Sequence, residues 1–300
     1  MPQRLSASQR LSPCFVPSAL ALLTFVSVLA GADRALGADR LAWTGAVTQV
    51  EGAAGGGLVP WALIAGLGTR DQIGGSAFLS YVNSADFSMR AGGIAAGFHD
   101  RVELSFARQR FDASSVIPGL TLGQDVFGLK FKILGDAVFA PDRWTPQVAI
   151  GVQQKRTLDF DPIPHAVGAQ KGRDFDIYVA ATKLYFAALA GRNVIANATL
   201  RRSRANQFGL LGFSGDRRAS YRYLPEGSIG IFATDNVLVG GEWRSKPDNL
   251  GAFAEREAKD LFVAWNPDKS VTATLAWIDL GAIAGKPAQR GLYASIWYGF

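Results

Sequence analysis

Two histidines, His99 and His165, are the side chains best suited to acid–base or nucleophilic catalysis in this chain. His99 stands beside Asp100 in the turn-like triplet HDR, and His165 ends the proline-rich stretch DPIPH. A Ser–His–acid hydrolase needs such an imidazole beside an activated serine, often in a G-x-S-x-G turn. No serine in the sequence has this setting. We therefore interpret both histidines as turn and loop residues and predict that the protein is not an enzyme.

Acidic pairs offer the other recognisable chemistry. Two such pairs flank one long loop, Asp159 with Asp161 and Asp174 with Asp176. Their oxygens suit a hard cation such as Ca²⁺, but solvated acids at the base of a loop are the simpler interpretation. Cys14 is the only cysteine, and two distant histidines do not form a zinc site. The sequence predicts no metal site and no cofactor.

The first 38 residues have the pattern of a secretory signal peptide. An apolar run at 15–30 follows a positively charged start and precedes small residues, and cleavage after Ala32 or after Ala38 fits this pattern. A single membrane-anchoring helix is the alternative, which the shortness of the run and its proline disfavour. We expect residues 1–38 to be a signal peptide and the folded protein to follow it.

Beyond the leader, side chains alternate with a period of two. Phe127, Leu129 and Phe131 share one face of a predicted strand, with Lys130 and Lys132 on the other. Twelve segments of this kind predict strands at 74–84, 87–98, 101–112, 124–134, 144–156, 173–185, 193–204, 218–233, 236–246, 259–265, 269–279 and 290–300.

The Gly-rich stretch 39–73 is the N-terminal part of the predicted mature chain, and its place is open. Its segments 41–50 and 58–68 also alternate and could add two strands, giving fourteen. Bacterial barrels have even strand numbers, so both segments join the wall or neither does. If neither joins, the stretch is a plug inside the barrel or lies along its periplasmic rim. The barrel itself is then 74–300 with twelve strands, which we favour.

Connections between the predicted strands alternate in length. Short ones, such as HDR at 99–101 and PDR at 141–143, carry Asp in turn settings, whereas longer ones collect Gly, Pro, Ser and charges. Alternating short and long connections are typical of an antiparallel up-and-down barrel with two unlike ends. We predict an all-β transmembrane barrel with long extracellular loops and short periplasmic turns.

The side chains on the face opposite the apolar one indicate whether the apolar face meets lipid or the core of a soluble protein. It holds mostly Gly, Ala, Ser, Thr and Gln, and only 19% of the chain is charged, which fits a lipid-embedded barrel better than a soluble sandwich. The net charge of +6 is too small to suggest nucleic acid. Aromatic residues near strand ends suit interfacial girdles: Trp61, Trp144, Trp243, Trp265, Trp297, Tyr298 and Phe300.

Charged residues fall into two predicted groups. Those on the inward faces of the strands are expected to line the lumen: Glu103, Lys130, Lys132, Glu242 and Arg244. Basic residues at the long loops could meet the phosphates of lipopolysaccharide, because arginine binds phosphate through forked donors. The candidates are Arg201, Arg202, Arg204, Arg217 and Arg218. Generic solvation of the loops is the alternative.

Two parts of the sequence resemble known proteins. The ending LYASIWYGF, with Trp297, Tyr298 and the terminal Phe300, resembles the C-terminal signal that the barrel-assembly machinery of Gram-negative bacteria recognises. The stretches GAVTQVEGAAGGGLVPWALIAGLGTRDQIG at 45–74 and DRVELSFARQRFD at 100–112 resemble the family named domain of unknown function 3034, predicted outer-membrane proteins. The resemblance implies an outer-membrane barrel and brings no activity or site residues.

Three functions remain open from the sequence. A passive, porin-like channel for small solutes is the first, because mixed charges line the predicted lumen. A non-conducting structural or assembly-related barrel, closed by the Gly-rich segment, is the second. An outer-membrane lipid hydrolase is a remote third. The expected partners are outer-membrane lipids, lipopolysaccharide and the assembly machinery, with no nucleic acid.

Overall fold

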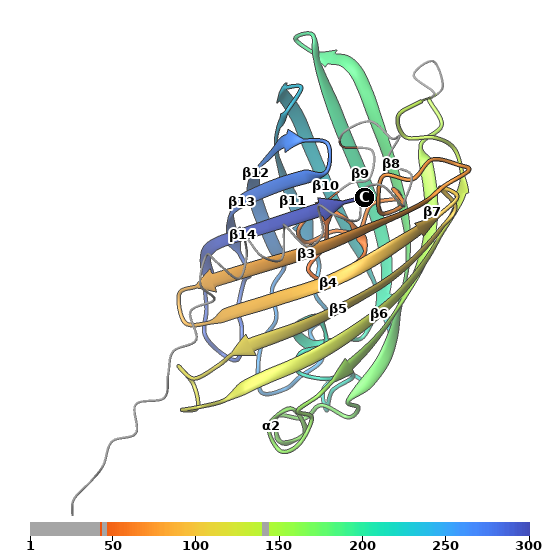
Figure 1. Cartoon of the computed structure of the whole chain (residues 1–300). Coiled ribbons are helices and arrows are strands. Elements are labelled where there is room, and N and C mark those ends of the chain that lie inside the picture. Colours follow the sequence, from red (N-terminus) through yellow and green to blue (C-terminus); the bar gives the residue numbers. More distant parts are fainter. Residues whose placement is uncertain (1–42, 44–46, 140–143) are drawn as a thin grey trace, which may run out of the picture. The chain divides into compact units, whose positions relative to one another are not determined.

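The computed structural model describes Trp43 and residues 47–139 and 144–300. Twelve antiparallel strands close into one barrel, in which β14 pairs with β3 and every other neighbour is consecutive in sequence (Figure 1). The predicted all-β barrel of twelve strands is confirmed, and the alternative of fourteen is wrong. The signal peptide predicted for residues 1–38 lies outside the described residues.

The strands of the barrel match the predicted segments closely. They are β3 (Ile73–Ser84), β4 (Ser88–Phe98), β5 (Val102–Asp112), β6 (Thr121–Leu134), β7 (Gln147–Thr157), β8 (Arg173–Leu189), β9 (Arg192–Ser203), β10 (Arg222–Thr234), β11 (Val237–Arg244), β12 (Ala258–Asp268), β13 (Val271–Asp279) and β14 (Arg290–Gly299). Two short helical turns lie in the connections, α2 (Ile163–Ala166) and η1 (Asn206–Gly209). No helix in the described part of the chain is long and apolar enough to cross a bilayer.

The last strand closes the barrel. Residues 291–299 of β14 pair with 76–84 of β3, and the backbone N–H of Phe300 donates to the carbonyl of Gly75 at 2.9 Å. On the inner side of this seam, the hydroxyls of Ser80 and Ser295 are 2.9 Å apart. Because both neighbours of β14 are paired strands, the aromatic C-terminal run has no free edge.

The outer face of the wall is apolar. Ile94, Leu129 and Leu275 are 61%, 37% and 67% exposed, whereas residues one position away along the strands, such as Lys130 and Ala276, are buried inside. An apolar outer face on a closed barrel, with all strand edges paired, is the architecture that a bilayer requires. The protein is therefore built as a transmembrane barrel.

The two ends of the barrel differ as predicted, with one local difference. Long connections at 113–120, 158–172, 204–221, 245–257 and 280–289 share one end with the short turn at 85–87. At the other end, β7 begins at Gln147 rather than at Trp144, so the connection from β6 is longer than the predicted turn. Pro146 has no backbone N–H to donate to a neighbouring strand, so the strand begins only after it. The PDR triplet itself includes residues outside the described part.

Candidate functional site

The segment from Val47 to Gly68 lies inside the barrel. It contains a two-stranded hairpin of β1 (Val47–Thr48) and β2 (Ala54–Gly55), which is separate from the barrel sheet. Almost every residue of the segment is buried. Trp61 and Leu63 belong to the same buried apolar cluster as Phe78 and Trp297 of the wall. The segment therefore occupies the lumen and adds no strand to the wall.

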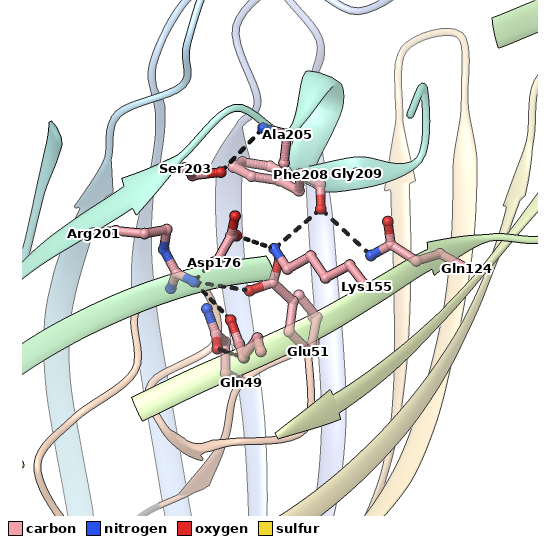
Figure 2. A network of polar contacts seen from close by, with 12 residues as sticks. Gln49, Glu51, Gln124, Lys155, Asp176, Arg201, Ser203, Ala205, Phe208 and Gly209 are labelled. Carbon is pink, nitrogen blue, oxygen red and sulfur yellow. Dashed lines mark hydrogen bonds and ion pairs between the residues drawn. The ribbon is translucent and has the colours of Figure 1, made fainter. Parts of the chain in front are cut away.

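A buried ionic cluster holds the start of this segment (Figure 2). The Glu51 carboxylate lies 2.5 Å from Nζ of Lys155, 3.0 Å from Nη2 of Arg244 and 3.9 Å from Nη1 of Arg201. Each of these side chains is at most 2% exposed. Two wall carboxylates complete the cluster: Asp176 lies 2.8 Å from Lys155, and Glu226 lies 3.3 Å from Nε of Arg244 and also bonds Arg201.

The formal charges of this cluster balance only when the segment is in place. The wall supplies three cations and two carboxylates, and Glu51 supplies the third carboxylate. An uncompensated charge in a dry interior is costly, so the wall favours the state in which the segment is inserted. The wall contributions come from five consecutive strands: Lys155 (β7), Asp176 (β8), Arg201 (β9), Glu226 (β10) and Arg244 (β11).

A second charged pair clamps the backbone of the segment. Glu103 and Lys130 form an ion pair of 3.1 Å with both side chains 1% exposed. The Glu103 carboxylate accepts hydrogen bonds from the N–H groups of Ala54 and Ala65, at 3.1 and 2.9 Å. The Lys130 ammonium donates to the carbonyls of Ala54 and Leu63, both at 2.9 Å. These wall charges thus serve as partners for backbone groups that have left water.

Further polar side chains of the wall do the same along the segment. The Glu242 carboxylate accepts from the N–H of Leu58 at 2.7 Å, and Nη1 of Arg244 donates to the carbonyl of Leu58 at 3.1 Å. At Ala62, the N–H donates to the Thr182 hydroxyl and the carbonyl accepts from the Gln147 amide, both at 2.7 Å. These lumen side chains are therefore engaged with the backbone of the segment.

One long loop also enters the lumen. Gln207 and Phe208 of η1 have left-handed backbone angles, with φ of 45° and 61°. This conformation costs roughly 1 kcal/mol or more for a non-glycine residue, so it requires compensation. The Phe208 carbonyl accepts from Lys155 Nζ at 3.1 Å (Figure 2). The Gly209 carbonyl accepts from the Thr157 hydroxyl at 2.7 Å. The loop thereby covers the ionic cluster from the long-loop end.

All five residues predicted to line the lumen are buried on the inner side. Glu103, Lys130, Glu242 and Arg244 bind the N-terminal segment as described above. Lys132 instead pairs with Asp100, at 2.6 Å, near the short-turn end. The sequence pattern placed these side chains but did not show that a segment of the same chain would be their partner.

The prediction that Arg201 contacts lipopolysaccharide is wrong. Arg201 is 1% exposed and points into the lumen, because side chains alternate along β9 and this position falls on the inner face. Its neighbour Arg202 points outward and stacks over the Tyr221 ring, 3.6 Å from the centroid. Arg204 pairs with Asp174 at 2.5 Å. The remaining two candidates, Arg217 and Arg218, lie exposed on the loop between β9 and β10.

The aromatic residues divide between the two faces. Trp144, Trp243 and Trp265 are 87%, 41% and 53% exposed, as a girdle requires. Trp61 and Trp297 are only 3% and 2% exposed and pack inside the barrel, so their assignment to the girdle is wrong. Along β14, alternation places Trp297 on the inner face. At the chain end, Tyr298 is only 6% exposed, so its assignment to an exposed girdle is also wrong. Its ring lies 6.1 Å from that of Phe300, which is half-buried.

The histidines and acidic pairs lie in connections or serve as structural partners. Nδ1 of His165 is 3.0 Å from Asp161 on the exposed loop, and Nδ1 of His99 is 3.2 Å from the carbonyl of Arg70. Asp159 accepts from the N–H of Gly123 at 2.8 Å. Among the described residues, no group of three or more His, Cys, Asp or Glu side chains could hold a metal ion.

Sequence reasoning missed Glu51 and three wall residues of the same ionic cluster. Alternation along the predicted strands could have placed these three in the lumen, because each falls on an inward-facing position: Lys155, Asp176 and Glu226. Nothing in the pattern shows that Glu51, in the Gly-rich stretch, would join them in one cluster. Their convergence depends on strand order around the barrel.

Comparisons with known proteins give one family and several barrels of low similarity. No curated protein matches the chain. A NanC porin structure has 12% identity and a TM-score of 0.46, covering 75% of this chain and 98% of the porin. A Rhodopseudomonas blastica porin triple mutant has 8% identity and a TM-score of 0.22, covering 76% and 99%. The model of the family described as "Protein of unknown function (DUF3034)" matches residues 44–297, so the chain belongs to this family.

Proposed function

We propose that this protein is an outer-membrane β-barrel of a Gram-negative bacterium whose lumen is held closed by its own N-terminal segment. The observation that carries the proposal is the Glu51 carboxylate, which is wholly buried among three cations of the wall. A passive channel for small solutes needs lumen side chains that face water. The geometry instead favours the second function considered from the sequence, a non-conducting barrel.

The outer-membrane location rests on the wall itself. Lipid-facing residues such as Leu104 and Leu292 are 50% and 66% exposed, and closure leaves no strand edge for water or other chains. Closed antiparallel barrels with an apolar outer band are the form that outer-membrane proteins take. The sequence pattern of a signal peptide and of a C-terminal assembly signal agrees with export to that membrane.

Conductance in planar bilayers tests the closed lumen. We expect no steady current from the full-length folded protein, and current from a Glu51→Gln, Glu103→Gln variant, in which the segment loses two of its anchors. A deletion of residues 47–68 provides a second open form. Steady conductance of the unmodified protein would contradict the proposal. If neither altered form carries current, the barrel is non-conducting but the segment is not the only part that closes it.

Lipopolysaccharide remains the partner that we propose for the exposed arginines of the long loops. Arg217 has a side chain that is 58% exposed, and Arg218 is also exposed. We expect Arg217→Gln, Arg218→Gln to lower the lipopolysaccharide retained on purification, because two forked phosphate donors are lost. Arg101→Gln, Arg192→Gln is the matched control, since these two exposed arginines lie at the short-turn end of the barrel. Equal retention in all forms would remove the idea.

We expect no catalytic activity. The remote alternative, a lipid hydrolase, depends on His99 or His165, and both lie in connections between strands. A lipase assay of the protein beside a His99→Ala, His165→Ala variant decides the matter. Activity that the double substitution abolishes would restore the hydrolase.

A further inference from the structure

An apolar cavity of about 140 Å³ lies between the N-terminal segment and the long loops. Val50 and Leu58 of the segment contribute to its lining, and Met89, Phe111 and Leu122 contribute from the wall. Phe111 and Leu122 belong to a second buried apolar cluster, distinct from the one around Trp61. The cavity therefore sits on the long-loop side of the inserted segment.

Among the side chains that line this cavity, Asp260 is the only charged one, and the ionic cluster around Glu51 lies outside the lining. Phe208 lines it, while the carbonyl of the same residue accepts from Lys155 and the ring is covered by the guanidinium of Arg244, 4.3 Å from the ring centroid. The polar groups in the lining are few: Ser84, Ser88, Gln207, Asp260 and Tyr293. The ionic cluster and the cavity are thus neighbours that meet at Phe208.

The cavity has an apolar rim on one loop. Val116 and Ile117, between β5 and β6, belong to its lining and are 41% and 40% exposed. Exposed apolar side chains that continue into an apolar cavity mark a route by which an apolar molecule leaves water. Neither a passive channel nor a simple plug requires such a lining, since both need polar or fully packed contacts.

We propose that this cavity binds a small uncharged apolar molecule, of the size of a single-ring aromatic or a short alkyl chain. A dry apolar cavity of about 150 Å³ takes up benzene, and this cavity is of similar volume. The occupant comes either from the medium, as a free hydrocarbon, or from the membrane, as an acyl chain. The site goes beyond the proposed function, because it does not depend on whether the lumen conducts.

Met89 provides the measurement. It is one of two methionines in the chain, the other being Met1, and it lines the cavity. In protein labelled with ¹³C at the methionine methyl groups and held in detergent micelles, we expect toluene to shift the Met89 resonance saturably. Benzoate, which is charged, should leave the resonance unchanged. Contacts between the Met89 methyl and detergent alkyl chains before toluene is added, and their loss afterwards, would identify an acyl chain as the natural occupant.

Variants separate binding in the cavity from partition into the micelle. Leu122→Trp and, as a milder filling, Ala113→Leu should abolish the saturable shift, because both residues line the cavity. Ile94→Trp, on the outer face, should retain it. A response to toluene that is linear and equal in all forms would overturn the proposal. The readout is independent of conductance, so a failure here and a failure of the closed lumen are distinguishable.

Discussion

Glu51 and Lys155 form an ion pair of 2.5 Å across 104 residues of sequence, with neither side chain exposed. One belongs to the segment inside the barrel and the other to its wall. The pair joins parts of the chain that could otherwise separate without breaking the barrel. It is therefore the contact through which closure of the lumen is most directly tested.

Replacing Glu51 should loosen the segment and leave the barrel folded. We expect Glu51→Gln to cost about 3–5 kcal/mol, because three buried cations of the wall then face only two carboxylates. Cysteine accessibility in a Cys14→Ser background measures the effect. Ala54→Cys, at a position with 0% exposure, should resist a water-soluble maleimide and become reactive once Glu51→Gln is added. Ser114→Cys, on an exposed loop, should react in both forms. Protection of Ala54→Cys in the altered protein would contradict this account.

The pair of Glu103 and Lys130 should show strong coupling. Lys130→Met alone leaves a buried carboxylate without its partner and should lower the free energy of unfolding by about 3–5 kcal/mol. The double variant Lys130→Met, Glu103→Gln should lose less than the sum of the two single substitutions. Urea unfolding in lipid vesicles, measured on the unmodified protein, each single variant and the double variant, completes the double-mutant cycle. The exposed pair of Arg217 and Asp248 is the matched comparison, with an expected coupling of about 0–1 kcal/mol. Additive effects at Glu103 and Lys130 would argue against the clamp.

A pH-dependent contact lies in the loop between β11 and β12. Burial raises the pKa of Glu255 to about 7, although the Lys246 ammonium 3.8 Å away opposes the rise. Because the folded pKa is above the ordinary value of 4.5, the carboxyl favours the folded loop most below pH 4.5 and loses this contribution as pH rises to about 7. We expect the protection factors of the amides in this loop, corrected for the intrinsic pH dependence of exchange, to fall across that window, and Glu255→Gln to remove the fall. Exchange with no difference between the two proteins over this range would refute the assignment.

The outer face should resist charge at mid-depth. Leu275, at the centre of β13, is 67% exposed on the apolar side. We expect Leu275→Lys to lower the free energy of unfolding in bilayers by about 2–4 kcal/mol, because the ammonium enters hydrocarbon. Ser114→Lys, on a loop, should change it little. A protein that remained folded and monodisperse in plain buffer would contradict the membrane assignment as a whole.

Much of the barrel was predictable because a strand has a short, local rule. Alternation places Lys130 inward and Leu129 outward whatever the partners are, and turn residues separate one strand from the next. Local errors arose where a backbone property intervened, as at Pro146. Alternation along the strands also places Arg201 and Trp297 on the inner face, whereas their residue types, near strand ends, suggest the surface.

The sequence by itself determined the twelve alternating segments, the two faces of the wall and the unlike ends, since each depends on neighbours a few residues apart. Whether 41–50 and 58–68 add two more strands was open from the sequence, and the closed barrel decided it. The tertiary structure alone decided what fills the lumen. Glu51 meets Lys155 and Arg244 only because the strands close in order and turn these side chains to one centre, where charges without water must pair. The apolar cavity likewise exists only once the inserted segment and the long loops meet across the barrel.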